Sequence, residues 1–198
     1  MRLAGEHGEP VADATSTPSF GPSALATPAN AVTMARIVVL PVLIALIAGR
    51  GTEWPALAVW VVLAGSDFAD GWLARRHGTT RSGAFLDPLA DKVIVLGAMA
   101  ALVGRGLLWW IPVTIIAVRE VALSVYRSYV GRRGVSVPAR FQAKVKTWMQ
   151  DIAVGLAIAP IAGEAYRDFR VGVLWVAVAL TVVTGAQYLW DGRRVLHA

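Results

Sequence analysis

Six long apolar runs, separated by short polar or basic segments, make up most of the chain from about residue 30 onward. Each run is close to the roughly 20 residues that a helix needs to cross the hydrocarbon core of a bilayer. The pattern therefore predicts an all-α fold, an integral membrane bundle of six transmembrane helices. The predicted spans lie at about 31–49, 54–76, 84–104, 108–130, 142–162 and 170–190.

Residues 1–26, which precede the first apolar run, are rich in Pro, Ser, Thr, Ala and Gly. They contain no apolar stretch long enough to enter a membrane, and this composition is typical of disordered segments. The segment is also unlike a signal peptide, because no apolar region opens the chain. We therefore expect a disordered tail over 1–26 and a membrane domain over 27–198.

The overall composition agrees with a membrane protein and excludes several kinds of site. Of the 198 residues, 56% are hydrophobic and 16% are charged, whereas about a quarter are charged in an average soluble domain. The absence of cysteine excludes disulfides, zinc thiolates and cysteine nucleophiles. The net charge of +6 suits an anionic membrane surface and anionic substrates. Because the basic residues lie between apolar runs, with no soluble basic domain, we expect no nucleic-acid partner.

Positive charge is divided unevenly between the two sides that the six spans define. Ten Lys and Arg residues flank the spans on one side and four on the other. Cytoplasmic loops carry the excess of Lys and Arg, so we expect a multi-pass cell-membrane protein with the first side and both termini in the cytoplasm. The ten are Arg75, Arg76, Arg81, Arg132, Arg133, Arg140, Lys144, Lys146, Arg193 and Arg194, and the four are Arg50, Arg105, Arg167 and Arg170.

Four aspartates at the cytoplasmic ends of the second and third spans carry the candidate chemistry, in DFADGWLARRHGTTRSGAFLDPLAD. Asp67 and Asp70 are three residues apart, Asp87 and Asp91 are four apart, and either spacing puts both carboxylates on one helix face. Four facing carboxylates cannot all stay ionised without cations. Hard divalent metals such as Mg²⁺ or Mn²⁺ prefer oxygen ligands, and two of them form a clamp for in-line displacement at phosphorus. The pattern indicates such a two-metal site.

The neighbours of the aspartates favour a phosphate ligand. Gly71 and Gly83 allow a bulky group to approach the backbone. Arg75 follows the first aspartate pair by about one helical turn, where it could take a phosphate oxygen. Thr80 and Arg81 in the connecting loop could add a hydroxyl and a cation. Taken singly, an aspartate near a helix end is more often a cap, and Asp87 before a proline fits an N-cap.

Together these residues resemble the signature of the CDP-alcohol phosphatidyltransferases, D-x2-D-G-x2-A-R-x8-9-G-x3-D-x3-D. Only seven residues, RHGTTRS, separate the signature's arginine from its second glycine here, and the shortening falls in the loop between the aspartate pairs. Six spans are also what the family has. The eight fixed positions are matched by Asp67, Asp70, Gly71, Ala74, Arg75, Gly83, Asp87 and Asp91.

The resemblance implies a specific reaction. A CDP-linked lipid would bind with its diphosphate on two metal ions, Mg²⁺ or Mn²⁺, held by Asp67, Asp70, Asp87 and Asp91. Asp91 resembles the general base that takes a proton from the acceptor hydroxyl, which attacks the lipid-linked phosphorus while CMP leaves. The family also implies a homodimer surrounded by membrane lipids.

The first span carries a second match, to the N-x2-T-x2-R segment of the family. Asn30, Thr33 and Arg36 occupy its fixed positions. The resemblance implies that they line the CDP-lipid site together with Gly71, Arg75 and Thr80. The residues alone also fit a plain helix start, with an asparagine cap, a back-bonded threonine and an arginine that extends to the membrane surface.

Three further stretches resemble the phosphatidylglycerophosphate synthases within this family, namely FLDPLADKV, IPVTIIAVREVALSVYRSY and ARFQAKVKTWMQD. The implied acceptor is glycerol 3-phosphate and the implied donor CDP-diacylglycerol. A small dianion needs fixed cations, and the candidates are Arg119, Arg127, Lys144 and Lys146. A structural Arg119–Glu120 pair and an ordinary cytoplasmic lysine excess are the alternatives.

Other functions remain open on the sequence. The same chemistry with phosphatidylglycerol would give a cardiolipin synthase, and with inositol phosphate an inositol-phospholipid synthase. A cation-coupled transporter would use the aspartates as an ion site, but the charges cluster at one membrane face rather than at the midplane.

Overall fold

The computed structural model describes residues 28–49, 53–77, 83–132 and 141–196, and within them the side chains of 31–49, 53–66, 89–129 and 144–190. The predicted tail over 1–26 lies outside these residues. Every regular element in the described part is a helix, which confirms the all-α class. The helices are α1 (Pro28–Ala48), α2 (Trp54–His77), α3 (Gly83–Gly104), α4 (Trp110–Arg132), α5 (Phe141–Ile158) and α6 (Glu164–Leu196).

The helices follow the apolar runs closely, with one clear difference between α5 and α6. The fifth run was expected to continue to 162 and the sixth to begin at 170. Instead α5 ends at Ile158, α6 begins at Glu164, and Pro160 and Gly163 lie between them. Proline has no N–H to continue a helix, and Gly163 adopts a φ of 124° that favours glycine. The turn is therefore shorter, and α6 longer, than the apolar pattern predicts.

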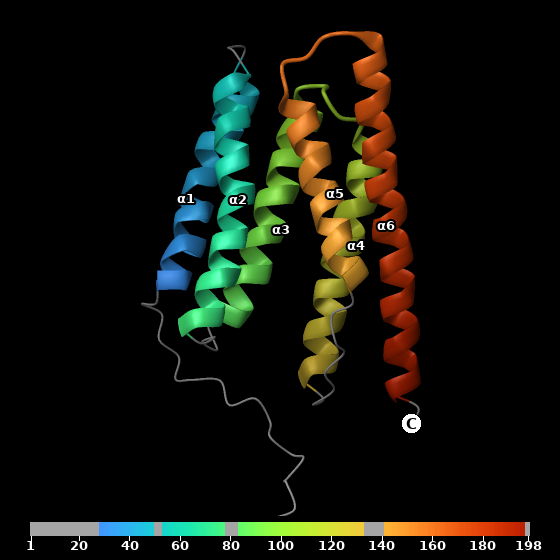
Figure 1. Ribbon diagram of the computed structural model, residues 1–198. Helices are drawn as coiled ribbons and strands as arrows, with labels where there is room; N and C mark the ends of the chain where they lie inside the picture. The colour runs from blue at the N-terminus through green and yellow to red at the C-terminus, as the bar shows by residue number, and fades with distance from the viewer. Residues whose placement is uncertain (1–27, 50–52, 78–82, 133–140, 197–198) are drawn as a thin grey trace, which may run out of the picture.

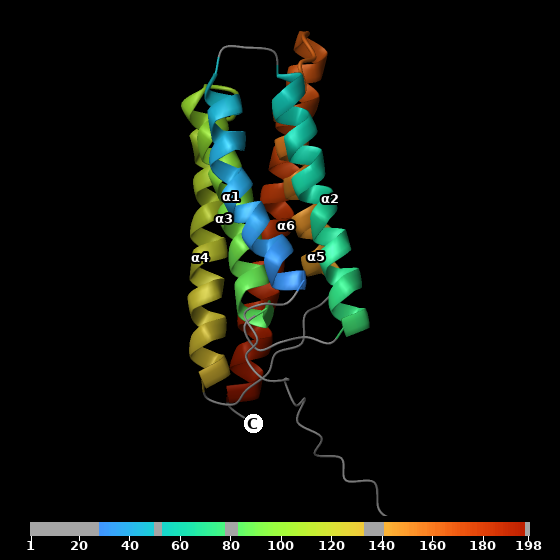
Figure 2. The same ribbon diagram turned by 90° about the vertical axis from the view of Figure 1, so that its left-hand side faces the viewer.

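The six helices run side by side as two groups of three (Figure 1). Helix α1 packs against both α2 and α3, and Figure 2 shows it crossing in front of α3. Helix α6 packs against α4 and α5. Helix α3 joins the groups, because it contacts α4 and α5 as well as α1. Residues from α3 can therefore meet side chains from both groups.

Close apolar packing holds the bundle together. Leu43, Met99 and Leu102 are completely buried. Where α1 crosses α3, a Cβ added to Gly97 would lie 3.4 Å from the methyl groups of Leu40, so the glycine permits ordinary van der Waals contact between the helices.

Helix α2 is attached to α5 through Trp60. Its indole N–H donates to the backbone carbonyl of Asp151 across 3.1 Å. The same ring lies against Gly155, where an added Cβ would be 3.4 Å from it. A buried tryptophan with a satisfied N–H gives both packing area and a fixed orientation.

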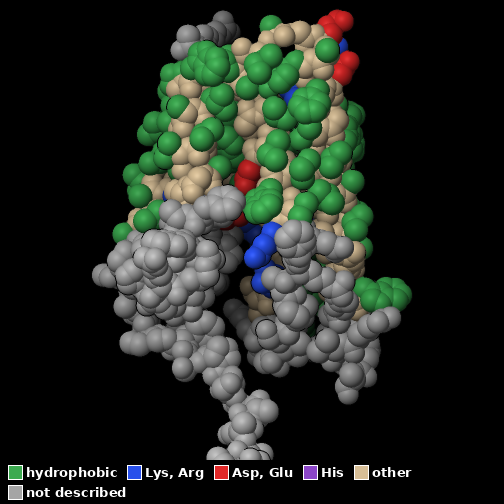
Figure 3. Space-filling model, viewed as in Figure 1, with side chains coloured by type: hydrophobic (Ala, Val, Ile, Leu, Met, Phe, Trp, Pro, Cys, Tyr) green, Lys and Arg blue, Asp and Glu red, His purple; other side chains and the backbone are tan. Residues whose placement is uncertain are grey.

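The outer surface is largely apolar (Figure 3). By length and composition, two helices of the described part are suited to cross a membrane, Ala31–Ala48 and Glu164–Trp190, while the apolar stretch Trp54–Ser66 is shorter. Helices α2 to α5 each carry charged residues within their length, which lowers their mean hydropathy. The number of membrane spans therefore stays a prediction.

Candidate active site

An ion pair between α1 and α3 marks one side of the site. An Nη atom of Arg36 lies 3.6 Å from a carboxylate oxygen of Asp91. Arg36 is buried, and so is Thr33, one turn earlier on α1. The expectation that Arg36 extends to the membrane surface is therefore wrong, because its charged group is directed into the bundle toward a carboxylate. The side chain of Asp91 keeps 27% of its surface exposed, so it is accessible to a ligand.

Glu120 forms the centre of a second group of charges, which joins α3, α4 and α5. One carboxylate oxygen of Glu120 accepts hydrogen bonds from Nη1 of Arg119 at 2.7 Å and from Nζ of Lys146 at 2.5 Å. Its other oxygen lies 4.0 Å from Nζ of Lys92. Lys92 also donates to the hydroxyl of Ser124. We call Lys92, Arg119, Glu120, Ser124 and Lys146 the Glu120 cluster.

The Glu120 cluster carries more positive than negative charge. Three cationic side chains surround one carboxylate among its members. Glu120 and Lys146 expose only 4% and 8% of their side chains, so water screens this charge poorly. Uncompensated charge in such a setting is costly and favours an anionic ligand. Figure 3 shows acidic and basic side chains together in the furrow between the two groups of helices.

Helix α6 supports the cluster with hydroxyl groups. Nη2 of Arg119 donates to Thr184 across 2.8 Å. One turn earlier on α6, Thr181 accepts a hydrogen bond from the amide of Gln150 at 2.9 Å. Both threonines are buried on a helix that is otherwise mostly apolar, so these contacts fix α4 and α5 against α6.

The backbone brings the two aspartate pairs to one end of the bundle. Asp67 and Asp70 lie in the second half of α2, and Asp87 and Asp91 lie in the first half of α3, on either side of the short connection 78–82. Since α3 begins at Gly83, Asp87 is inside the helix and is not its N-cap. The side chains of Asp67, Asp70 and Asp87 lie outside the described residues.

The structure describes some of the other predicted donor-site residues and leaves others outside the described part. Asn30 lies inside the first turn of α1, so it is not the residue that precedes the helix. Gly71 and Arg75 belong to the last turns of α2, and nothing is described of Arg75 beyond its backbone. Thr80 and Arg81 lie outside the described residues.

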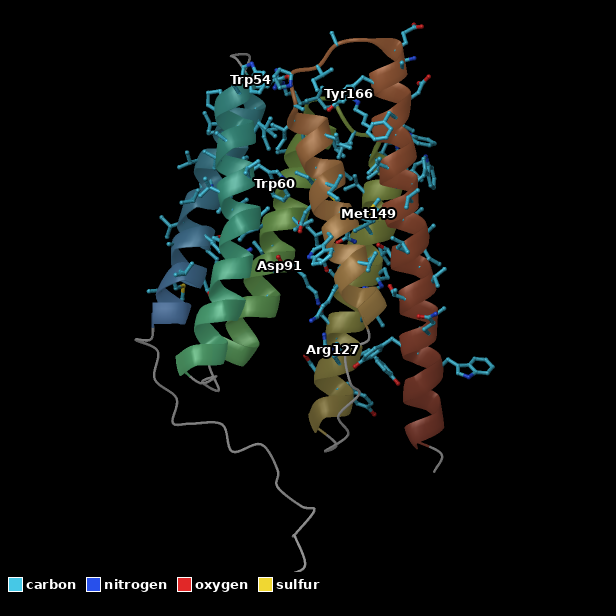
Figure 4. The ribbon with its side chains drawn as sticks, in the orientation of Figure 1. Trp54, Trp60, Asp91, Arg127, Met149 and Tyr166 are labelled. Carbon is cyan, nitrogen blue, oxygen red and sulfur yellow. The ribbon has the colours of Figure 1, made fainter. Side chains whose placement is uncertain are left out.

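The four predicted acceptor-site cations separate into two kinds. Arg119 and Lys146 belong to the Glu120 cluster. Arg127 is exposed on α4, with its guanidinium 5.9 Å from the ring centre of Tyr188. Lys144 is exposed on α5 and is not brought into the cluster. In Figure 4, Arg127 lies closer than Asp91 to the end of the bundle where α2 ends and α3 begins.

Sequence reasoning missed Lys92, Ser124 and Thr184. Lys92 directly follows Asp91. That position was the available signal, because neighbouring residues on a helix lie at nearly the same depth in the bundle as each other, here next to a candidate catalytic carboxylate. Ser124 is four residues after Glu120, on the same helix face. Nothing in the sequence indicates Thr184, which is a hydroxyl residue in an apolar run.

The donor set fits divalent metal ions. All four candidate ligands are carboxylates, the hard oxygen donors that Mg²⁺ and Mn²⁺ prefer, and they lie on single turns of two successive helices. Asp91, the one whose side chain is described, is partly accessible.

Comparison with known proteins identifies the family. The family model described as CDP-alcohol phosphatidyltransferase matches residues 26–183. The chain belongs to the CDP-alcohol phosphatidyltransferase family. Members of this family are enzymes, and they generally depend on divalent metals.

Relatives of the chain carry related names. A probable phosphatidylglycerophosphate synthase of Mycobacterium tuberculosis is 40% identical over 176 residues, which cover 85% of this chain and 83% of that protein. A CDP-diacylglycerol--glycerol-3-phosphate 3-phosphatidyltransferase of Rickettsia felis is 36% identical over 166 residues, covering 80% and 91%. One of the same name from Shigella flexneri is 34% identical over 173 residues, covering 84% and 91%.

Proposed function

We propose that the protein transfers a phosphatidyl group from CDP-diacylglycerol to glycerol 3-phosphate, with phosphatidylglycerophosphate and CMP as products. The observation that carries the proposal is the buried excess of positive charge in the Glu120 cluster. One member of the cluster, Lys92, directly follows Asp91 on α3. A small dianion bound there would have its hydroxyl end free to approach Asp91. The names of the relatives support the same donor and acceptor.

On the donor side, Asp67, Asp70, Asp87 and Asp91 would hold two divalent cations, Mg²⁺ or Mn²⁺. When bound, these ions supply positive charge to the diphosphate of the donor. The remaining donor contacts come from α1, α2 and the loop that follows α2. They are Asn30, Thr33, Arg36, Gly71, Arg75 and Thr80.

Asp91 acts as the general base. Its carboxylate takes the proton from the acceptor hydroxyl as that oxygen bonds to the lipid-linked phosphorus, and the bond from this phosphorus to the CMP oxygen breaks. Arg36, 3.6 Å away, holds the carboxylate in position. The furrow orients donor and acceptor so that the displacement becomes effectively intramolecular.

On the acceptor side, Lys146, Arg119 and Lys92 bind the phosphate. Their bonds to one shared carboxylate leave donor hydrogens for a ligand, because a lysine has three N–H donors and an arginine five. Arg127 and Lys144, which are exposed, act at the margin by attracting anions into the furrow.

We place all six helices in the membrane. They contain 18 to 33 residues, and 18 residues suffice for a short span. The loop charges put the furrow and both termini on the cytoplasmic side, and the family resemblance implies a homodimer. Every helix exposes large apolar side chains that suit lipid, including Val38, Val62, Val93, Val121, Ile152 and Val182.

An acceptor panel tests the proposal. The purified full chain would be given CDP-diacylglycerol, Mg²⁺ and, separately, glycerol 3-phosphate, phosphatidylglycerol or inositol phosphate. CMP release and chromatography of the lipid product should show turnover with glycerol 3-phosphate and far less with the others. Preference for another acceptor would overturn the acceptor assignment, and ion flux without CMP release would overturn the enzymatic one.

A further inference from the structure

Helix α6 brings a hydroxyl group and a glycine against the guanidinium of Arg119. Thr184 is buried, and so is Gly185 next to it. The family match ends at residue 183, so both residues lie just beyond it.

Two hydrogen bonds fix the guanidinium of Arg119 from opposite sides. Nη1 donates to Glu120 at 2.7 Å and Nη2 donates to Thr184 at 2.8 Å. The hydroxyl of Thr184 donates in turn to the carbonyl of Leu180 at 2.6 Å. Its oxygen is thereby held with a lone pair toward the arginine, because a hydroxyl has one hydrogen to donate.

Gly185 allows the side chain of Arg119 to lie on the surface of α6. A Cβ added at this glycine would be 3.0 Å from Nε of Arg119 and 3.4 Å from its Cγ. A contact at that distance would require the arginine to shift. The absence of a side chain therefore sets the distance between Arg119 and α6.

The Nε–H of Arg119 is buried and makes no hydrogen bond within the part of the chain that the structure describes. A buried donor without an acceptor is costly. This nitrogen packs against Gly185, so a ligand would reach the guanidinium through the second hydrogen on each Nη atom. The clamp therefore fixes the orientation of these hydrogens in a region that already has an excess of positive charge.

We propose that Thr184 and Gly185 are positioning residues for the acceptor phosphate and act through Arg119. Thr184 and Glu120 each hold one hydrogen of an Nη group, Gly185 sets the depth of the side chain, and the remaining Nη hydrogens serve the ligand. The inference rests on the proposed function, since it takes the acceptor to be a small phosphate ester.

The main test substitutes glycines on α6. Gly185→Ala should displace Arg119 and raise the KM for glycerol 3-phosphate about tenfold, the loss of one charge-assisted hydrogen bond. The KM for CDP-diacylglycerol and kcat should stay near wild type. Gly172→Ala is the matched control, because it changes the same helix where an added Cβ would meet nothing within 4 Å.

A second pair of variants tests the hydroxyl. Thr184→Val keeps the shape and removes the acceptor for Nη2, so it should also raise the KM for glycerol 3-phosphate. Thr184→Ser keeps the hydroxyl, so its KM for glycerol 3-phosphate should stay near that of the wild type. If Thr184 had a purely structural role, the KM values for both substrates would change together, or the amount of folded protein would fall.

Binding of glycerol 3-phosphate, measured by calorimetry without turnover, separates the possible failures. If the wild type binds it and Gly185→Ala binds it equally well, the positioning role is overturned while the proposed function stands. If the wild type does not bind it, the acceptor assignment is overturned and this inference with it. An equal effect of Gly172→Ala would also contradict the inference.

Discussion

Charged side chains in two regions of the bundle, one at an end and one near mid-height, are arranged in opposite ways. At the end where α6 begins, Glu53 pairs with Arg105 at 3.2 Å, one acid with one base, and each side chain is 24% exposed. In the furrow, three cations share Glu120, which is only 4% exposed. The first arrangement is complete and hydrated, whereas the second is buried and carries excess charge. Burial together with charge imbalance, rather than the presence of ion pairs, therefore sets the candidate binding site apart.

The largest effect is expected from Asp91→Asn. Removal of the proposed general base should lower kcat by about 10²–10⁴-fold, the usual contribution of such a group, while binding of CDP-diacylglycerol persists. CMP release and a filter-binding assay with labelled donor would measure the two quantities.

The matched control for this variant is Asp168→Asn, which removes an exposed aspartate at the opposite end of the bundle. It should leave both quantities unchanged. Full activity of the Asp91 variant would contradict the assignment of the base.

A smaller effect is expected from Lys146→Met, compared with Lys144→Met on the same helix. The buried lysine contacts Glu120 and the exposed one does not belong to the cluster. Loss of a charged hydrogen bond should raise the KM for glycerol 3-phosphate about 10–100-fold at Lys146. The exposed charge at Lys144 should change it by less than about twofold. Steady-state kinetics with each substrate varied would show the ranking, and the reverse ranking would move the acceptor site toward the membrane surface.

The smallest effect is expected from Glu53→Gln. The pair with Arg105 is partly exposed, and surface pairs contribute about 0.2–1 kcal/mol. The thermal unfolding midpoint should fall slightly, without a change in either KM. A change in either KM would show that the Glu53–Arg105 pair and the Glu120 cluster are coupled, and would contradict their separation.

The helices were predictable because the apolar runs are long and the connections short. The turn between α5 and α6 was harder, because Pro160 and Gly163 lie within a stretch that stays mostly apolar. Hydropathy carries little information there about where the helix ends. The two aspartate pairs were predictable as helical turns because their spacing is local.

The partners of the charged residues were not predictable, because they depend on the rotation of each helix. Lys144 and Lys146 are two residues apart, which turns them about 200° around the helix axis. A soluble helix would reveal its inner face by its apolar stripe. Here the outer surface is apolar as well, so the pattern does not distinguish the buried lysine from the exposed one. For the same reason, the sequence does not indicate that Thr184 lies on the buried face of α6.

Helix α6 has 33 residues, about 50 Å at the usual rise of an α-helix, whereas the hydrocarbon core of a bilayer is roughly 30 Å thick. Several of its turns must therefore lie among headgroups or in water. Exposed ionic residues at its beginning and the exposed Trp190 near its other end resist movement along the bilayer normal. We therefore expect the height of Thr184 beside Arg119 to depend partly on the surrounding lipid, so that acyl-chain length should change the affinity for the proposed acceptor.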